Sequence, residues 1–458
     1  MISDKKTFQF KEAVSILFLI LAIIFTSLFV LKTEPHLALL NCLVVVASLG
    51  LIKRYTWKEL ETGMIKGIQS GIQPIIVLAL IGILIGAWMS SGTIPTVMVY
   101  ALTVINPNYL LITSLFSCMV ISSLVGSSFT TVSTVGVALM GAGIAIGIPA
   151  PWVAGAIICG ACFGDKMSPM SDTTNFASGV SSVELFTHIR HMTKTTIPSI
   201  LITTLIFFII GRITPIHSAS LSEMTNMINI IETHVQISSL TLLSPVLVII
   251  LAIRKVPVVP ALIVGIITAG ITAVGFQGVK LSEFLHVLQN GTTFTIENAQ
   301  VVNMMNRGGL QSMMWSISLI LIAFAFGGLL DMLNIIPTLL NGLIERVKTK
   351  GQLILSTAAS SFGVNLLTGE QYLSILIPGQ SFKGIYDKMK LERKYLSRTL
   401  EDAGTLINPL IPWGVSGAFF AQTLGVPVIA FLPFAFFLYL SPFFSILFGF
   451  FSKVKTTS

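Results

Sequence analysis

Three charged residues, Asp165, Lys166 and Asp172, interrupt a long neutral stretch of the chain. The 98 residues before Asp165 contain no Asp, Glu, Lys, Arg or His. An ionisable side chain at bilayer depth costs on the order of several kcal/mol, and it usually faces a water-filled cavity or an ion path. The segment FGDKMSPMSDTTN, at residues 163–175, is therefore the first candidate for a functional site.

The residues around Pro169 are rich in oxygen atoms that suit a hard cation such as sodium. Proline lacks an N–H donor and disfavours helix at the residue before it, so we expect the helix to stop near Ser168. Unwound backbone inside a membrane is tolerated where it lines a cavity or is buried in protein. The oxygen-bearing side chains of this segment are Asp165, Ser171, Asp172, Thr173, Thr174 and Asn175.

Asp165 and Asp172 are the expected sodium ligands of this segment. Two carboxylates close together in a poorly solvated site repel each other, which favours protonation of at least one of them. Protons and sodium would then compete for one pocket, which is the minimum requirement for exchanging one for the other. In the structural alternative, Lys166 pairs with one of the two acids and stabilises the fold.

A second segment, EDAGTLINPLIPWG at residues 401–414, repeats this order of acids, glycine, small polar residues and prolines. Its candidate ligands are Asp402, Thr405 and Asn408. Glu401 and Asp402 follow the basic segment 383–398. In the alternative interpretation, these two acids only neutralise the basic segment near the cytoplasmic surface. We favour this alternative for Glu401.

Glu370 is a further candidate for the ion path. It closes a charge-free run that begins at Gly351, and Asn365 and Thr368 precede it by one or two helical turns. The alternative is an acid at a turn on the outer surface.

The elements that position these residues are expected to be membrane helices. The chain has 458 residues, of which 53% are hydrophobic and 10% charged, and its mean hydropathy is +0.89. Its basic residues, which give a net charge of +8, alternate with apolar spans of about 20 residues, the length that crosses a bilayer. We therefore expect an all-α polytopic membrane protein that contacts lipid and does not bind nucleic acid.

The distribution of Lys and Arg predicts the orientation in the membrane, because cytoplasmic loops accumulate basic residues. A topology with both termini inside places 22 of them in inside segments and four in outside loops. The apolar run 14–31 is longer than that of a signal peptide and has no clear cleavage site, so we expect a retained first helix. The expected location is the cytoplasmic membrane of the cell, with both termini cytoplasmic.

The two halves of the chain resemble each other. SGIQPIIVLALIGILIGAWMSSGTIPT from Ser70 matches GGLQSMMWSISLILIAFAFGGLLDMLNIIPT from Gly308, at offsets of 238 and 242 residues. GSSFTTVSTVG from Gly126 then pairs with SSFGVNLLTGE from Ser360, and the two polar segments pair with each other. Equivalent loops fall on opposite sides in the predicted topology, so we expect inverted repeats, the architecture of secondary transporters.

This repeat predicts the organisation of the whole chain. It consists of an N-terminal helix at 1–35, repeat 1 at 36–214, a connecting loop and helix at 215–255, repeat 2 at 256–452 and a tail at 453–458. We expect about 11 to 14 membrane segments, with broken helices and re-entrant hairpins.

Other polar motifs carry weaker signals. His188 and His191 lie one helical turn apart; we expect solvated loop histidines, and a pH-sensing patch is the alternative. All four cysteines lie in apolar spans, so no disulfide framework is expected. The chain lacks a Walker A, an H-E-x-x-H and a nucleotide-binding motif. We therefore expect neither an enzyme nor a cofactor.

GDKMSPMSDTTNFASGV and HIRHMTKTTIP in the first half, with YLSRTLEDAGTLINPLIPWGVSG in the second, resemble the NhaC-type sodium/proton antiporter family. The resemblance covers nearly the whole chain. It implies the ion-transporter fold with inverted repeats, and it implies Na+ and H+ as transported ions. The family also includes a malate/lactate antiporter, so small carboxylates are candidate partners besides Na+ and H+. A second copy of the chain, in a homo-oligomer, is a further candidate partner.

The resemblance carries site residues over by motif. In the first segment it implies Asp165, Asp172, Thr173, Thr174 and Asn175, and in the second Asp402, Thr405 and Asn408. The family motif has Asn after Pro-Trp, where this chain has Gly414, so an amide ligand is absent there.

Three functional hypotheses follow. The leading one is gradient-driven Na+/H+ antiport, with Asp165 and Asp172 alternating between proton and sodium. The second is an exchanger of organic acids coupled to H+ and Na+, with its anion held by Ser127, Ser128, Thr130, Thr131 and Lys166. The third is a membrane hydrolase that uses Asp165 and Asp172 as an acid/base pair, which the internal repeat disfavours.

Overall fold

The computed structural model describes residues 7–104, 107–213, 219–254, 256–298, 301–302 and 305–451. Within these residues the chain forms helices and no β-sheet, which confirms the all-α prediction. The predicted tail at 453–458 lies outside the described residues.

The helices of the first half are α1 (Phe10–Phe25), α2 (Pro35–Ile52), α3 (Trp57–Ser70), α4 (Ile72–Ser90), α5 (Thr93–Val104), α6 (Leu110–Val125), α7 (Ser128–Thr131), α8 (Val137–Ala145), α9 (Ala150–Met167), α10 (Asp172–Ser181), α11 (Leu185–Ile213) and α12 (Ala219–His234). Those of the second half are α13 (Leu243–Ile253), α14 (Val258–Gly275), α15 (Leu281–Asn290), α17 (Leu310–Met332), α18 (Ile335–Ile344), α19 (Lys350–Thr368), α20 (Gln371–Lys388), α21 (Arg393–Leu400), α22 (Val415–Leu424), α23 (Val428–Phe431) and α24 (Phe436–Phe451). Short π-helical turns occupy Thr26–Val30, Val132–Gly136 and Glu401–Thr405.

Several of these helices are long and apolar enough to cross a membrane. Among the described residues there are five: Phe10–Leu28, Pro35–Ile52, Leu185–Ile213, Val258–Gly275 and Leu310–Met332. Three bent helix pairs raise the number to eight if each pair is one span. The chain is therefore a multi-pass membrane protein, and its fold includes bent helix pairs.

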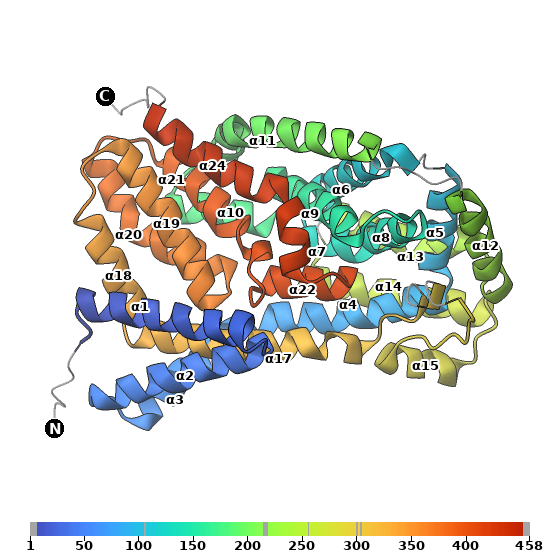
Figure 1. Ribbon diagram of the computed structural model, residues 1–458, viewed down its shortest axis with the longest axis horizontal. Helices are drawn as coiled ribbons and strands as arrows, with labels where there is room; N and C mark the ends of the chain where they lie inside the picture. Colours follow the sequence, from blue (N-terminus) through green and yellow to red (C-terminus); the bar gives the residue numbers. More distant parts are fainter. Residues whose placement is uncertain are drawn as a thin grey trace.

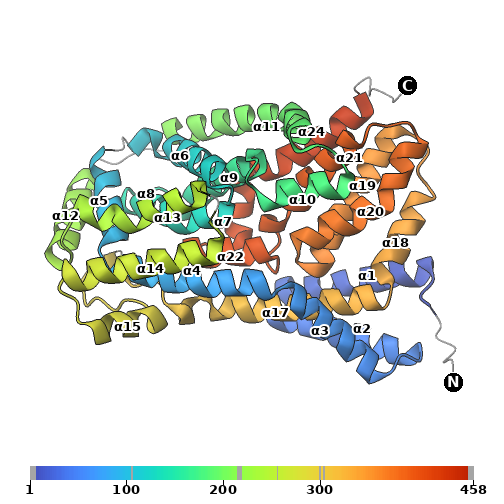
Figure 2. The same ribbon diagram turned by 180° about the vertical axis from the view of Figure 1, so that it is seen from behind.

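The long helices surround a central region that contains the short helices α7 and α22. Figure 1 shows α1, α4, α11 and α17 running along the long axis, with α5 and α12 at one end and α18 to α20 toward the other. In both views α7, α9 and α22 lie in the middle of the molecule, and the start of α1 and the end of α24 lie at the same end (Figures 1 and 2). Which side of the membrane this end faces remains a prediction.

Small residues let α6 and α9 approach each other closely. A Cβ added at Gly160 would lie 2.2 Å from the carbonyl oxygen of Leu115, and one added at Gly164 would lie 2.5 Å from that of Met119. Close packing of small residues is a common way to join helices in membranes. This contact fixes the end of α9, which carries Asp165, against the end of α6.

Element boundaries recur at a spacing of 243 residues in the two halves. Helix α6 ends before Gly126 and α19 ends before Gly369, and both glycines are left-handed, with φ of 72° and 68°. Helix α9 begins at residue 150 and α21 at 393, while α10 begins at 172 and α22 at 415. This recurrence supports a duplication, and the inverted orientation of the two copies remains a prediction, as do the predicted domain boundaries.

The predicted pairing of Gly126 with Ser360 was wrong by nine residues. Ser360 lies inside α19, whereas Gly126 ends a helix and introduces a new one, as Gly369 does. A left-handed backbone position strongly favours glycine. The turn glycines Gly126 and Gly369 therefore mark the alignment of the two halves better than the serines around them.

Candidate functional site

The first break lies between α9 and α10, as the position of Pro169 predicts. Helix α9 ends at Met167, and Ser171 caps the start of α10 by accepting a hydrogen bond from the N–H of Thr174 at 3.4 Å. The Thr174 hydroxyl donates to the carbonyl oxygen of Lys166 at 3.0 Å. The Asn175 amide donates to the carbonyl oxygens of Pro169 at 2.9 Å and Ser171 at 2.7 Å. The small polar side chains thus hold the unwound backbone in place.

Asp165 lies in the last turn of α9 and is buried. Its Oδ2 accepts hydrogen bonds from the N–H of Ser128 at 3.0 Å and from the Ser128 hydroxyl at 2.6 Å, so it is tied to the start of α7. Its Oδ1 has no hydrogen-bond partner among the described residues. A buried carboxylate with a free oxygen is costly unless a proton or a cation accompanies it.

Lys166 pairs with neither of the aspartates next to it in the sequence. Its ammonium forms an ion pair with Asp402 of the second break and donates to the Ser441 hydroxyl at 2.9 Å. The Asp402 carboxylate also accepts from the hydroxyls of Ser441 at 2.7 Å and Thr195 at 3.1 Å, and Arg398 Nε lies 4.0 Å from it. The structural alternative, in which Lys166 pairs with Asp165 or Asp172, is therefore wrong, and the ion pair with Asp402 joins the two breaks.

Glu401 is buried at the interface of the two breaks, so the interpretation that it neutralises the surface was wrong. It begins the π-helical turn that continues α21, a distortion often found at functional sites. Its Oε1 accepts a hydrogen bond from the Thr173 hydroxyl at 3.2 Å, and its Oε2 has no partner among the described residues. Thr173 in turn shares a 3.1 Å hydrogen bond with the Ser171 hydroxyl.

Asp165 and Glu401 form the least compensated part of the site. Glu401 is linked to the first break through the hydroxyls of Thr173 and Ser171, and Asp165 lies in the last turn of α9 just before that break. Neither acid has a Lys or Arg nitrogen within ion-pair distance among the described residues, because Lys166 and Arg398 both lie beside Asp402. The Thr405 hydroxyl is buried and also has no hydrogen-bond partner there.

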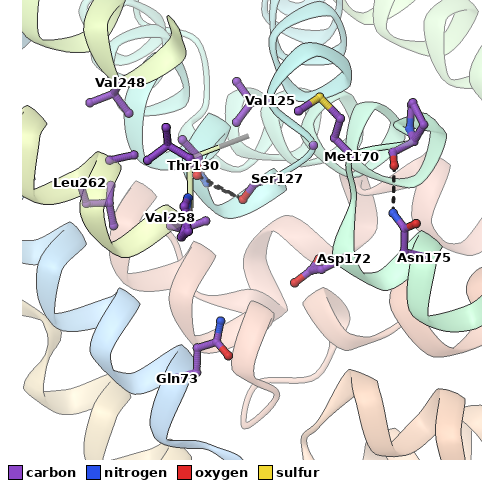
Figure 3. A pocket seen from close by; sticks show the side chains of 15 residues that line it. Gln73, Val125, Ser127, Thr130, Met170, Asp172, Asn175, Val248, Val258 and Leu262 are labelled. Atoms are coloured by element: carbon purple, nitrogen blue, oxygen red, sulfur yellow. Dashed lines mark hydrogen bonds between the residues drawn. The ribbon is translucent and has the colours of Figure 1, made fainter. Parts of the chain in front are cut away.

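Asp172 is exposed at the mouth of the site. It begins α10, and its Oδ2 accepts a hydrogen bond from the hydroxyl of Tyr372, a residue that the sequence analysis did not identify. Asp172 lines a cavity of about 530 Å³, which we call the Asp172 cavity. Figure 3 shows its carboxylate pointing into this space, with Gln73 on one side and the turn of Ser127 and Thr130 on another.

The wall of the Asp172 cavity is polar on one side and apolar on the other. Its polar side comes from both ends of the first break and from α7, and its apolar side from residues 256–262 at the start of α14, together with Val248. Asp172 is the one ionisable residue among the described residues that line it. Among its described lining residues, the cavity therefore carries one acidic side chain and no basic one.

The second break is held together by amide side chains. Asn408 donates to Asn365 Oδ1 and to the carbonyl oxygen of Gly369, both at 2.9 Å, and it accepts from the N–H of Ser416 at 2.8 Å. A Cβ at Gly414 would lie 2.6 Å from the carbonyl oxygen of Asn408. Glycine at this position therefore allows the tight packing.

Glu370 is buried rather than placed at the outer surface. It caps α20, with its Oε2 accepting from the N–H of Leu373 at 2.7 Å. It occupies the position after the turn glycine Gly369, as Ser127 does after Gly126. Glu370 lies near enough to Asp172 for the two charges to interact.

The histidines differ from the prediction of solvated loop residues. His188 and His191 are both buried in α11. His188 Nδ1 shares a 2.9 Å hydrogen bond with Ser397, and the His191 ring packs edge-on against Tyr395, with ring centroids 4.6 Å apart. All four cysteines are free and buried, as expected.

Comparison with known proteins decides the family. Residues 160–453, which contain both breaks, match the model of the Na+/H+ antiporter family. The chain belongs to this family. The NhaC-type resemblance of the sequence motifs is thereby confirmed.

The similarity to relatives extends over nearly the whole chain. The chain is 55% identical over 451 residues to "Na(+)/H(+) antiporter NhaC" of Bacillus subtilis (strain 168), covering 98% of this chain and all of the relative. It is 53% identical to the protein of the same name from Alkalihalophilus pseudofirmus, over 94% of this chain and 93% of the relative. It is 31% identical to the "Malate-2H(+)/Na(+)-lactate antiporter" of Bacillus subtilis, over 96% of this chain and 94% of the relative.

Proposed function

We propose that the protein exchanges Na+ for H+ across the cell membrane, driven by their gradients. The observation that carries this proposal is the cluster formed by Asp165 and Glu401, two buried acids from different breaks with no ion-pair partner among the described residues. Buried carboxylates need a proton or a cation to offset the loss of hydration. Such a pair can hold protons in one state and Na+ in another.

Na+ enters through the Asp172 cavity in this proposal. The carboxylate of Asp172, held by Tyr372, attracts the cation at the mouth, and Asp165 with Glu401 takes it over in the interior. The free hydroxyl of Thr405 and the hydroxyls of Ser171 and Thr173 supply neutral oxygen ligands. Hard oxygen ligands of this kind suit alkali cations.

Other predicted site residues position the ligands. Lys166 and Asp402 neutralise each other and connect the breaks, while Thr174, Asn175 and Asn408 hold unwound backbone. Glu370 caps α20 and adds negative charge near Asp172. Alternating access then requires movement of one repeat-derived unit against the other, because both breaks contribute to one ion site.

The Asp172 cavity supports a cation better than an organic anion. The proposed anion set included Lys166 and Ser128, but Lys166 is fully buried and paired with Asp402, and Ser128 binds Asp165. An anion in this cavity would meet the charge of Asp172, and no Lys or Arg is among the described residues of its wall to offset that charge. This favours Na+/H+ exchange over organic-acid exchange through the same path.

The test is the variant Asp172→Asn in inverted membrane vesicles or proteoliposomes. We expect this variant to lose Na+-dependent dissipation of a pH gradient, because the negative charge that attracts the cation is removed. The asparagine side chain has nearly the same size as aspartate and can keep the hydrogen bond with Tyr372. The matched control is Asp387→Asn, which alters an acid that is exposed and paired with Arg393 at 2.6 Å. Full exchange by Asp172→Asn, in protein that is expressed and folded, would contradict the assignment.

A further inference from the structure

A second polar cavity lies apart from both breaks. It has a volume of about 460 Å³ and is formed by the end of α15, the connection into α17 and the end of α22. Pockets of roughly 300–1,000 Å³ are typical of small-molecule sites. We call it the Arg307 cavity after the one ionisable residue among the described residues that line it.

The backbone around the Arg307 cavity is closely fitted. Gly308 and Gly309 have φ of 83° and 81°, and the N–H of Gly309 donates to the carbonyl oxygen of Gly82 in α4 at 2.7 Å. A Cβ at Gly308 would lie 2.2 Å from the nitrogen of Gly86. The connection that carries Arg307 is thus fixed against α4, so packing defines the backbone position from which Arg307 extends.

The opposite wall comes from the last turn of α22. Gln422 and Thr423 line the cavity, and the Thr423 hydroxyl is 3% exposed with no hydrogen-bond partner among the described residues. A buried hydroxyl without a hydrogen-bond partner is destabilising, and a ligand that bonds to it would offset this loss. The guanidinium of Arg307 lies against the same helix end, with Nη2 3.2 Å from the position of a Cβ on Gly425.

The charge and shape of the cavity specify the class of ligand. Guanidinium groups bind carboxylates through two parallel N–H groups, and amide and hydroxyl side chains extend such a site. Gln311 and Gln422 supply the amides, while Ile85 and Met313 give an apolar patch for a short carbon chain. No acid is among the described residues that line it, in contrast to the Asp172 cavity.

We propose that the Arg307 cavity binds a small organic carboxylate. The site is separate from the proposed ion path, and the inference goes beyond Na+/H+ exchange without depending on it. Helix α22 connects the two regions, because it begins at the second break beside Asn408 and ends at this cavity.

Isothermal titration of the purified full-length protein tests the proposal. Lactate and malate are added as choline salts at constant Na+, with choline chloride as the inorganic control. We expect carboxylate binding by the wild type, an affinity at least about tenfold lower for Arg307→Gln, and a smaller loss for Thr423→Val. Arg212→Gln, which removes an exposed arginine bonded to Tyr109, is the matched control and should bind as the wild type does.

Each other result has a defined meaning. No carboxylate binding by folded wild-type protein would overturn the proposal, and so would undiminished binding by Arg307→Gln or equal binding of chloride. Binding lost in Asp172→Asn but kept in Arg307→Gln would place the ligand in the Asp172 cavity and also overturn it. If Arg307→Gln does not fold, Gln422→Leu tests the same cavity from its opposite wall, and undiminished carboxylate binding by this variant would overturn the proposal. Na+/H+ exchange by each variant is measured separately, so failure of this site is distinguishable from failure of the proposed exchange.

Discussion

At the scale of single residues, the site separates compensated charges from uncompensated ones. Lys166, Arg398 and Asp402 lie together, and hydroxyls complete the environment of the carboxylate. Asp165 and Glu401 each keep one oxygen without a hydrogen bond among the described residues. In the proposed exchange, the first group stabilises the structure, and Asp165 with Glu401 binds the exchanged ion.

The ion pair between Lys166 and Asp402 predicts strong coupling in stability. Removing one partner leaves a buried charge, so Lys166→Met should destabilise the protein by about 3–5 kcal/mol. The double variant Lys166→Met with Asp402→Asn should lose much less than the sum of the two single losses. Thermal unfolding of the four proteins in detergent measures this, and additive losses would contradict a direct pair.

The residue types of the site could be predicted from the sequence, but their partners could not. Asp165, Asp172 and Asp402 were identified because charges in apolar surroundings are rare. The acids considered as partners of Lys166 were its neighbours in the sequence, whereas its partner Asp402 is 236 positions away. Glu401 was misjudged because the residues before it in the sequence are basic, although in the structure it lies against Thr173.

At the scale of elements, the site consists of the two breaks and of the ends of α6 and α19, which support them. The end of α6 positions Ser128 for Asp165, and the end of α19 positions Gly369 for Asn408. In each half, a left-handed glycine therefore introduces backbone that anchors a break. The breaks were predictable from proline and small polar residues, whereas these anchors depend on packing between distant segments.

The contact between α6 and α9 predicts a sensitive position at Gly160. Gly160→Val should lower stability by about 1–3 kcal/mol or more, because the added side chain would push against the carbonyl oxygen of Leu115. Exchange should also fall, since Ser128 moves away from Asp165. Thermal unfolding and transport assays check both effects. Gly179→Ala is the control, because nothing lies within 4 Å of its added Cβ and alanine favours helix; equal behaviour of the two variants would refute the packing argument.

At the scale of the whole molecule, the fold is an all-helical membrane transporter of the Na+/H+ antiporter family. Composition was sufficient to predict this class, and the motifs were sufficient to predict the family. The number of spans was harder to predict, because bent helix pairs resemble two short helices or one long one in sequence. Hydropathy measures apolar length and carries no information on bends.

The orientation in the membrane is also testable at this scale. The excess of Lys and Arg in the predicted inside segments implies cytoplasmic termini. Green fluorescent protein fused after Ser458 should therefore fluoresce, whereas alkaline phosphatase fused there should be inactive. The opposite pattern would reverse the predicted topology and exchange the two faces of the ion path.

The central claim is that protons and Na+ compete for the same buried carboxylates. The most direct measurement is the release of protons when Na+ is added to the purified protein in weakly buffered solution. We predict that the wild type releases protons as Na+ binds, that Asp165→Asn and Glu401→Gln release fewer, and that Asp387→Asn behaves as the wild type. Binding of Na+ without proton release, or unchanged release by both Asp165→Asn and Glu401→Gln, would contradict the claim.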